Sequence, residues 1–323
     1  MTDQSQSAGM PAIVAEGLSK SFPGVHAVDA LTIDVHPGEI FGLVGPDGAG
    51  KTTTLRMLAG IMPPDSGRAT VAGYDVVRDP EGAKHALSYM PQRFGLYEDL
   101  TVDENIRFYA DLFGVRKADR TTRSTELLEA AGMSEFRTRM AGKLSGGMKQ
   151  KLGLVCALIH RPKVILLDEP TTGVDPVSRR DFWRILYELV AEGVAILTST
   201  AYLDEAERCH RVALMHQGKL LFCDTPANLK SQMKKGVLSV TSAEPRPLRT
   251  ELEHAEGISS LVLTGDGVHI VVDEAAKRIP EFEARLKKAS VVYDAIQQVA
   301  PTIEDLFVDA VGASDEVGGA RHA

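Results

Sequence analysis

Long apolar runs, a signal sequence and a basic charge excess are all missing from this sequence of 323 residues. No apolar run approaches the about 18 residues that a membrane-spanning helix needs, so we expect any membrane span to come from another chain. The start, MTDQSQSAGMPA, lacks a basic segment followed by an apolar one, so no signal peptide is expected. The formal net charge of −8 argues against bulk binding of nucleic acid, and no nucleic-acid partner is predicted.

Cysteine is also scarce, with three residues and neither a CxxC pair nor a zinc-like spacing. Cys156 and Cys223 lie in apolar runs, where buried structural thiols are expected. An odd cysteine count without a framework fits a reducing cytoplasm. The nine histidines form no metal-binding pattern, and they are expected at the surface or in the core.

The distribution of apolar and turn residues divides the chain into four parts. With 44% hydrophobic residues the chain can bury a substantial core. We expect a disordered start over residues 1–11, an α/β domain over 12–235, a small α+β domain over 236–311 and a disordered tail over 312–323.

Within the α/β domain the pattern changes from strands to helices and back. Apolar alternation from Ile13 to Val35 predicts antiparallel strands, and residues 98–161 are mostly helical in pattern. Thr101 and Glu104 have the spacing of a capping box that opens a helix. The apolar run Val164–Leu167 is typical of a strand covered on both faces. A helix is predicted from Pro176 to about Ala191.

One glycine-rich segment fits the pattern GxxxxGK[ST] at every fixed position. It lies between an apolar strand and a helix, as a phosphate-binding loop requires. Glycines let backbone N–H groups close around phosphate oxygens, and the helix start favours the anion. Lys51 would hold the β- and γ-phosphates, and the Thr52 hydroxyl would bind Mg²⁺. A plain glycine-rich turn with a solvated lysine is the alternative. The candidate nucleotide-binding residues here are Gly45, Pro46, Asp47, Gly48, Ala49, Gly50, Lys51, Thr52 and Thr53.

Two acids, Asp168 and Glu169, follow the apolar run that ends at Leu167. The carboxyl ends of strands face the ligand crevice of an α/β sheet. Asp168 would hold Mg²⁺ through water, and Glu169 would orient and deprotonate the attacking water. Taken alone, such acids are often only the polar start of a loop; downstream of a phosphate loop they predict a hydrolytic site.

A third motif lies between the other two, in the order that ABC ATPases have. The segment Leu144, Ser145, Gly146, Gly147, Met148, Lys149, Gln150 resembles the LSGGQ signature of that family, with Met148 at the usual glutamine position. The resemblance covers about residues 13–230. It implies a RecA-like P-loop α/β core with an antiparallel β edge, an inserted helical subdomain and a small C-terminal α+β appendage. It also implies that the signature docks on the nucleotide of a second subunit, as another helix N-terminus that binds an anion.

Other positions are carried over from the resemblance one by one. Gln92 matches the glutamine that touches Mg²⁺ and water and reports to the membrane subunit. Phe22 matches the aromatic residue that stacks on adenine, with a core aromatic as the alternative. Asp175 matches the aspartate of the family's D-loop, and it also fits as the N-cap of a helix with Pro176 at its first position.

Two further segments resemble the drug-export branch whose permeases are of the ABC-2 type. They are residues 93–101 and the segment 301–307 near the C-terminus. The similarity extends to the N-terminal ATPase half of tandem multidrug exporters. It implies ATP hydrolysis with Mg²⁺, coupled to export of a drug-like substrate through separate membrane permeases. The implied partners are those permeases and a second ABC ATPase, and the implied location is the cytoplasmic side of the cell membrane.

One position departs from the family pattern. After the apolar run Val194–Leu197 the family has a histidine that contacts the γ-phosphate, whereas Ala201 stands here. Loss of one such hydrogen-bonding group commonly costs about 10²–10³ in rate. A weak site in a heterodimer and a regulatory subunit that clamps ATP are therefore open alternatives. A non-transport ABC protein is disfavoured, because those typically carry two cassettes or a long coiled coil.

Overall fold

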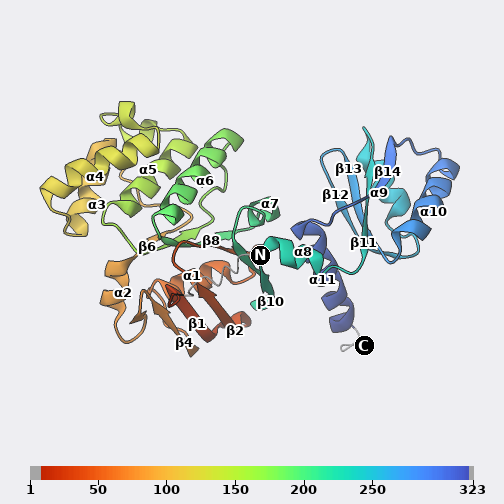
Figure 1. Cartoon of the computed structure of the whole chain (residues 1–323), viewed down its shortest axis with the longest axis horizontal. Helices are drawn as coiled ribbons and strands as arrows, with labels where there is room; N and C mark the ends of the chain where they lie inside the picture. The colour runs from red at the N-terminus through yellow and green to blue at the C-terminus, as the bar shows by residue number, and fades with distance from the viewer. Residues whose placement is uncertain (1–8, 320–323) are drawn as a thin grey trace, which may run out of the picture. The chain divides into compact units, whose positions relative to one another are not determined.

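The computed structural model describes residues 9–319, with the backbone alone from residue 312 onward. The chain forms two compact units (Figure 1). The first holds the described residues up to Tyr202 together with Cys209–Cys223, and the second holds Leu203–Arg208 together with the chain from Asp224. Among the described residues, no helix has both the length and the apolar character needed to cross a membrane.

The first unit is built around a six-stranded sheet of order β10-β9-β3-β8-β7-β6. The pairs from β9 through β3, β8 and β7 to β6 are parallel. Every residue of β3, β7 and β8 is buried, as expected for strands covered on both faces. The strands are β3 (Ile40–Val44), β6 (Leu87–Met90), β7 (Val164–Asp168), β8 (Ala195–Thr200), β9 (Arg211–His216) and β10 (Lys219–Asp224).

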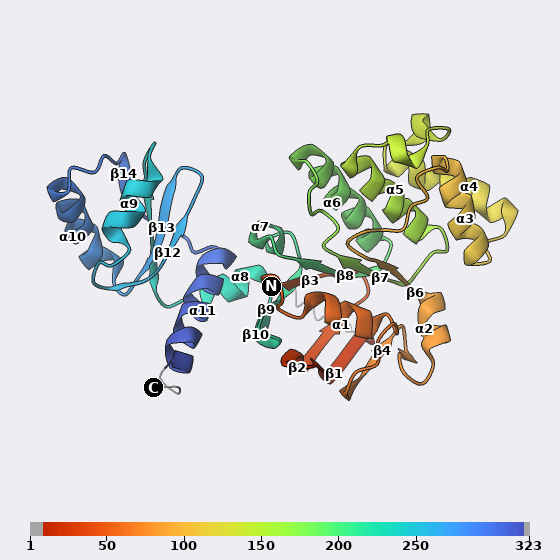
Figure 2. The ribbon, with the colours of Figure 1, turned by 180° about the vertical axis from the view of Figure 1, so that it is seen from behind.

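A second, antiparallel sheet of order β2-β1-β4-β5 forms the predicted β edge. Helix α1 (Lys51–Leu58) lies between the two sheets (Figure 2). Its buried side chains Leu55, Met57 and Leu58 join a core that both sheets share. The strands are β1 (Ile13–Phe22), β2 (Val25–Val35), β4 (Ser66–Val71) and β5 (Tyr74–Asp75), and the short α2 (Pro80–Ala86) leads to β6.

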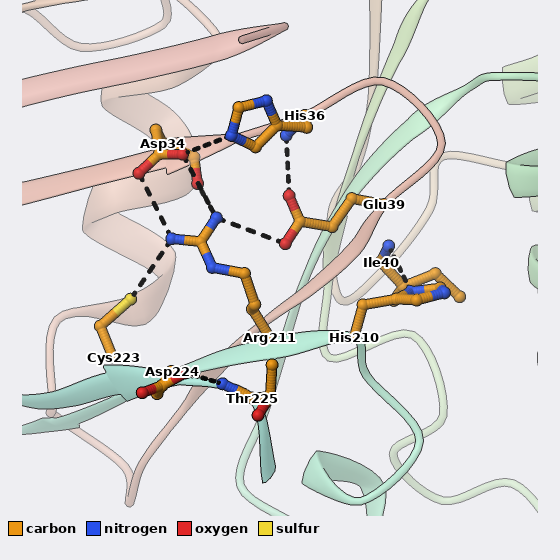
Figure 3. Close-up of polar contacts among 9 residues, drawn as sticks. All are labelled: Asp34, His36, Glu39, Ile40, His210, Arg211, Cys223, Asp224 and Thr225. Carbon is orange, nitrogen blue, oxygen red and sulfur yellow. Dashed lines mark hydrogen bonds and ion pairs between the residues drawn. The ribbon is translucent and has the colours of Figure 1, made fainter. Parts of the chain in front are cut away.

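An ion-pair network ties the two sheets together at β9 (Figure 3). The Arg211 guanidinium lies 3.2 Å from Asp34 on β2 and 3.4 Å from Glu39 in the turn before β3. His36 adds a contact of 2.9 Å to Asp34, and Arg211 also covers the ring of Phe41. The network therefore braces β3, the strand that leads into the glycine-rich loop.

The helical segment lies within the residues expected for it. It contains α3 (Val102–Leu112), α4 (Lys117–Ala130) and α5 (Gly146–Leu158). The capping box is confirmed, because the Glu104 N–H donates to Thr101 Oγ1 and the Thr101 N–H donates to the Glu104 carboxylate. Helix α6 (Pro176–Ala191) has the predicted bounds, and it covers the face of the six-stranded sheet opposite α1 (Figure 1).

The second unit is a four-stranded antiparallel sheet of order β12-β13-β11-β14. With two helices between its strands it has the βαββαβ order of a ferredoxin-like fold. Helices α9 and α10 pack on the sheet around Leu238, Ile270 and Phe282. The elements are β11 (Gly236–Thr241), α9 (Pro245–Leu252), β12 (Ile258–Leu263), β13 (Gly267–Val272), α10 (Ala275–Lys288), β14 (Ala295–Val299), α7 (Leu203–Ala206), α8 (Pro226–Ser231) and α11 (Ile303–Gly319).

The structure and the sequence-based expectations differ in this second unit. The sequence predicts strands at 237–241, 261–263 and 268–272 and a helix at 281–288 in this unit, but not α9 or β14. Helix α10 begins before Pro280, a residue that normally ends or kinks a helix. The compact units divide at residue 223 rather than near 235. Helix α11 runs to Gly319, beyond the point where a disordered tail was expected. The rest of that tail and residues 1–8 of the expected disordered start lie outside the described residues.

Candidate functional site: a nucleotide-binding cleft

The glycine-rich loop connects β3 to α1 at the carboxyl edge of the six-stranded sheet. Gly50, the N-cap of α1, has φ +102°, and a Cβ there would overlap the Ala27 carbonyl oxygen. Only glycine satisfies both conditions. No side chain caps α1, so the N–H groups of its first turn are available to an anion.

Lys51 points back into this loop. Its side chain is 4% exposed, and its Nζ donates to the carbonyl oxygens of Gly45 at 2.7 Å and Pro46 at 2.9 Å. The same Nζ lies 3.2 Å from Glu169 Oε1. Phosphate oxygens are stronger acceptors than these carbonyls, so the lysine is placed to exchange them for a bound phosphate.

Asp168, the last residue of β7, is buried and accepts three hydroxyl hydrogen bonds. Thr52 Oγ1 and Ser199 Oγ each donate to its Oδ1 at 2.9 Å, and Tyr89 Oη donates to its Oδ2 at 3.1 Å. Burial, together with the negative charge of Asp168, raises the pKa of Tyr89 to about 12. Tyr89 therefore keeps its proton at neutral pH and can donate it in a hydrogen bond to Asp168.

Glu169 follows in a strained backbone conformation, with φ +49°. Its N–H donates to Ser199 Oγ at 3.0 Å. Its carboxylate accepts from Gln92 Nε2 at 3.1 Å and from Thr172 Oγ1 at 3.4 Å, in addition to the Lys51 contact. The loop, both acids and Gln92 thus lie together at the carboxyl edge of the six-stranded sheet.

These groups surround a cleft of about 420 Å³. Phe22 stands at its rim with 42% of its surface exposed, as a ring that stacks on a ligand would. Gly45, Pro46 and Asp168 lie behind the lining and contact it through Lys51 and Thr52. The lining residues are Phe22, Val25, Ala27, Asp47, Gly48, Ala49, Gly50, Lys51, Thr52, Thr53, Gln92 and Glu169.

The donor set beside this cleft fits Mg²⁺. Thr52 Oγ1 and Asp168 Oδ1 are 2.9 Å apart, and Gln92 lines the same cleft as Thr52, so a hydroxyl, a carboxylate and an amide group are available there. Mg²⁺ prefers such oxygen ligands and is usually held by few side chains together with substrate phosphates. In the described part of the chain, no group of three or more His, Cys, Asp or Glu side chains could hold a metal ion.

The signature segment lies away from this cleft, and none of its described residues lines it. Ser145 is the N-cap of α5, and its Oγ accepts the Met148 N–H at 3.3 Å. A Cβ at Gly147 would overlap Ser178 in the first turn of α6. Asp175 caps α6 by accepting the N–H groups of Val177 and Ser178, and the Ser178 bonds lower its pKa.

The end of β8 carries no histidine, in keeping with the departure seen in the sequence. Ala201 follows the last strand residue and is exposed. The Tyr202 ring packs under the guanidinium of Arg179, 4.6 Å away on α6. Tyr202 is thus engaged with α6, and its hydroxyl does not line the described cleft.

Several residues of the site were missed from the sequence. Val25 and Ala27 line the cleft from β2, and Thr172 contacts Glu169. Tyr89 and Ser199 contact Asp168 from the two strands that flank β7. For Tyr89 and Ser199 the available signal was their place near the carboxyl ends of β6 and β8, at the same sheet edge as the two acids.

Comparisons with known proteins agree with this geometry. The family model described as ABC transporter matches residues 28–172. The chain is 46% identical over 315 residues to the probable multidrug ABC transporter ATP-binding protein YbhF of Escherichia coli (strain K12), covering 94% of this chain and 52% of YbhF. It therefore spans about half the length of that relative.

Two further matches each cover most of this chain and most of the matched protein. The daunorubicin resistance ATP-binding protein DrrA2 of Streptomyces coeruleorubidus is 34% identical over 317 residues, covering 97% of this chain and 98% of DrrA2. A solved structure described as the ATP binding subunit of an ABC transporter superposes with a TM-score of 0.63 at 31% identity, covering 68% of this chain and 92% of that one. The family inferred from the three motifs is confirmed, and this chain belongs to the ATP-binding proteins of ABC transporters.

Proposed function

We propose that the chain binds and hydrolyses ATP with Mg²⁺ as the motor subunit of an ABC exporter. The observation that carries this proposal is the convergence of Lys51, Thr52–Asp168 and Gln92–Glu169 on one cleft. Lys51 would hold the β- and γ-phosphates, and Phe22 would cover the base. Thr52, Asp168 and Gln92 would hold Mg²⁺, which neutralises charge on the phosphates. Glu169 would orient the water and take its proton.

The signature suggests that the working unit is a dimer. Its serine and glycines lie at the exposed start of α5, outside the cleft of their own chain. In a pair of such subunits, Leu144, Ser145, Gly146, Gly147 and Asp175 would close the nucleotide site of the other subunit. The second subunit is another copy of this chain or a related ATPase.

A second, apolar cleft supports a permease partner. Its volume is about 260 Å³, and Phe94, Tyr109 and Phe113 are among its lining residues. Gln92 is close to Phe94 in the sequence. Leu112, at the end of α3, is 65% exposed. A cytoplasmic segment of an ABC-2-type permease fits this surface, where it would sense Gln92. The subunit would then be held at the cytoplasmic side of the cell membrane.

Export of a drug-like or lipophilic substrate is proposed from the relatives, because YbhF is named a probable multidrug transporter protein and DrrA2 a daunorubicin resistance protein. The test is ATP hydrolysis by the chain reconstituted with its permease in vesicles. Hydrolysis that candidate drugs stimulate, together with ATP-dependent movement of those drugs, is the expected result. Binding of MgATP without any drug-dependent turnover would reject the export role alone.

Ala201 supports a second candidate, a regulatory subunit that clamps ATP and hydrolyses it slowly. In that case a heterodimer would have one strong and one weak site. Single-turnover hydrolysis by this chain alone, and in a mixture with a partner that carries the histidine, separates the two candidates. Fast turnover by this chain alone would reject the regulatory role.

A further inference from the structure

One buried hydroxyl touches both acids of the candidate active site. Ser199 is fully buried on β8, next to Asp168 in the parallel register of β7 and β8. Its Oγ donates to Asp168 Oδ1 at 2.9 Å and accepts the Glu169 N–H at 3.0 Å. A hydroxyl can make both bonds at once because it has one donor and two acceptor lone pairs.

Apart from Thr172, the side chains that contact the two acids fall into two groups. Lys51, Thr52 and Gln92 line the cleft, so their bonds to the acids face the place where nucleotide and metal would bind. Ser199 and Tyr89 reach Asp168 from the neighbouring strands and do not line the cleft. We call Ser199 and Tyr89 the sheet-side pair. Its bonds can persist when ligands replace those on the cleft side.

The Ser199 hydroxyl helps to hold the strained backbone of Glu169. A residue with φ +49° that is not glycine persists only when its surroundings hold it. Both the hydroxyl and the carbonyl oxygen of Ser199 accept the Glu169 N–H, at 3.0 and 3.2 Å. Without the hydroxyl, the contact to the Ser199 carbonyl remains, so the pairing of β7 with β8 should be kept. The orientation of the two acids should become less fixed.

We infer that Ser199, assisted by Tyr89, is a positioning residue that holds the metal-binding acid and the general base in register for hydrolysis. This inference rests on the proposed ATPase function. Groups that orient metal ligands from outside the first coordination sphere typically change affinity or activity by about 10–100-fold. The sheet-side pair has that place relative to Asp168.

The first test is single-turnover hydrolysis by the full-length chain with Ser199→Ala, Ser199→Thr and Ser88→Ala. Ser199→Ala should lower the rate at saturating MgATP by about 10–100-fold. Ser199→Thr keeps the hydroxyl and should recover most of the rate. Ser88→Ala removes another buried hydroxyl, on β6, that makes no bond to either acid, and it should leave the rate unchanged.

The second test is ATP affinity measured by calorimetry, with EDTA and with Mg²⁺. Ser199→Ala should bind ATP as wild type does in EDTA, and it should lose most of the affinity that Mg²⁺ adds. Tyr89→Phe keeps the ring and removes the bond to Oδ2, so it should shift both measurements in the same direction by a smaller factor. It also serves as the test if Ser199→Ala does not fold.

Three results would overturn the inference: a Ser199→Ala rate within about threefold of wild type, an equal loss in Ser88→Ala, or an equal loss of affinity in EDTA. Each requires a wild-type chain that binds MgATP. A wild-type chain that binds no nucleotide would instead reject the proposed function. The two failures are therefore distinguishable.

Discussion

The first unit contains two glycine-rich loops, each at the start of a helix, and they are built differently. The loop before α1 leaves the helix start uncapped and opens into a cleft of about 420 Å³. The loop before α5 is capped by its own Ser145, and no described residue of it lines that cleft. The first loop thus leaves N–H groups free to surround an anion, whereas in the second loop one N–H group already donates to Ser145.

The second loop is also held in place by its packing against the start of α6. Gly147 packs so closely on Ser178 that a side chain would not fit, and Asp175 caps the helix that carries Ser178. The start of α5 and the start of α6 therefore form one rigid edge. Such an edge supports the proposal that the signature acts on a nucleotide held by another subunit.

The largest expected effect comes from removing a lysine from the first loop, compared with removing one from the helix of the second loop. Lys51→Ala should weaken MgATP binding by about 100-fold or more, because the phosphates lose a charge-assisted donor inside the loop. Lys149→Ala, in the helix of the second loop, removes a partly exposed lysine that pairs with Glu98 and should leave affinity unchanged. Calorimetry measures both. Equal affinities for the two variants would contradict the assignment of the first loop.

Next is the general base. Glu169→Gln should slow hydrolysis by about 10²–10⁴-fold, the usual contribution of acid–base catalysis, while ATP still binds. A subunit pair that closes on uncleaved ATP should then accumulate and elute as a dimer in size-exclusion chromatography with MgATP. The matched sample with MgADP should stay monomeric. A monomer in both, with the natural partner present, would count against dimer closure.

Ser145→Ala addresses the second loop directly. Binding of ATP to the isolated chain should be unchanged, since Ser145 does not line its cleft. Hydrolysis by the dimer should fall by about 10–100-fold, because a donor to the partner's phosphate is lost. The lost helix cap should cost only about 1 kcal/mol of stability. Weaker ATP binding by the monomeric variant would show that this loop serves its own chain.

A smaller effect, of opposite sign, is expected at the end of β8. Ala201→His should raise the single-turnover rate by about tenfold, or about 1.4 kcal/mol of barrier. Lys51, Thr52, Gln92 and Glu169 are already in place, and imidazole near neutral pH can donate to the γ-phosphate. Tyr202→Phe is the control, because it tests whether the hydroxyl of the next residue takes the place of the missing histidine as a contact to the γ-phosphate. No gain from histidine, together with a large loss in Tyr202→Phe, would mean that the site is not weakened.

The sequence was sufficient for the parts of the site that are contiguous in the chain. The phosphate loop and the two acids after β7 each fit within a few residues, so a local pattern predicts them, and the signature was predicted from its resemblance to the family motif. Tyr89 and Ser199 could not be found in that way, since their role depends on which strands flank β7. Strand order arises from tertiary packing and leaves no local pattern.

The second unit shows the same limit in its fold. Its α+β class was expected, but neither α9 nor α10 has a side-chain cap and α10 contains Pro280 in its interior, so the local signals for these helices are weak. Packing of Leu248, Leu252 and Phe282 on the sheet outweighs those local preferences. Strand β14 is half exposed and rich in glutamine, so its apolar alternation is weak. It is recognisable only through its pairing with β11.

The smallest expected effect concerns the second unit and the pH dependence of its stability. Arg278, 4% exposed, holds Asp273 through two bonds of 2.9 and 2.8 Å. The Arg278 hydrogen bonds hold the pKa of Asp273 well below its usual range. A carboxyl group with a lowered folded-state pKa stabilises the fold above its unfolded pKa of about 3.9 and loses that effect as pH falls toward the folded pKa. Asp273→Asn should therefore lower Tm at neutral pH.

The difference in Tm between wild type and Asp273→Asn should stay constant between about pH 6 and 8 and shrink below about pH 4. Asp266→Asn is the matched control, because the described contacts of the Asp266 carboxylate are limited to the Thr264 hydroxyl and include no arginine. Its Tm difference from wild type should be small throughout. ATP affinity should be unchanged in both variants, since every residue of the nucleotide cleft lies in the first unit. A difference for Asp273→Asn that grows as pH falls would contradict the ion-pair explanation.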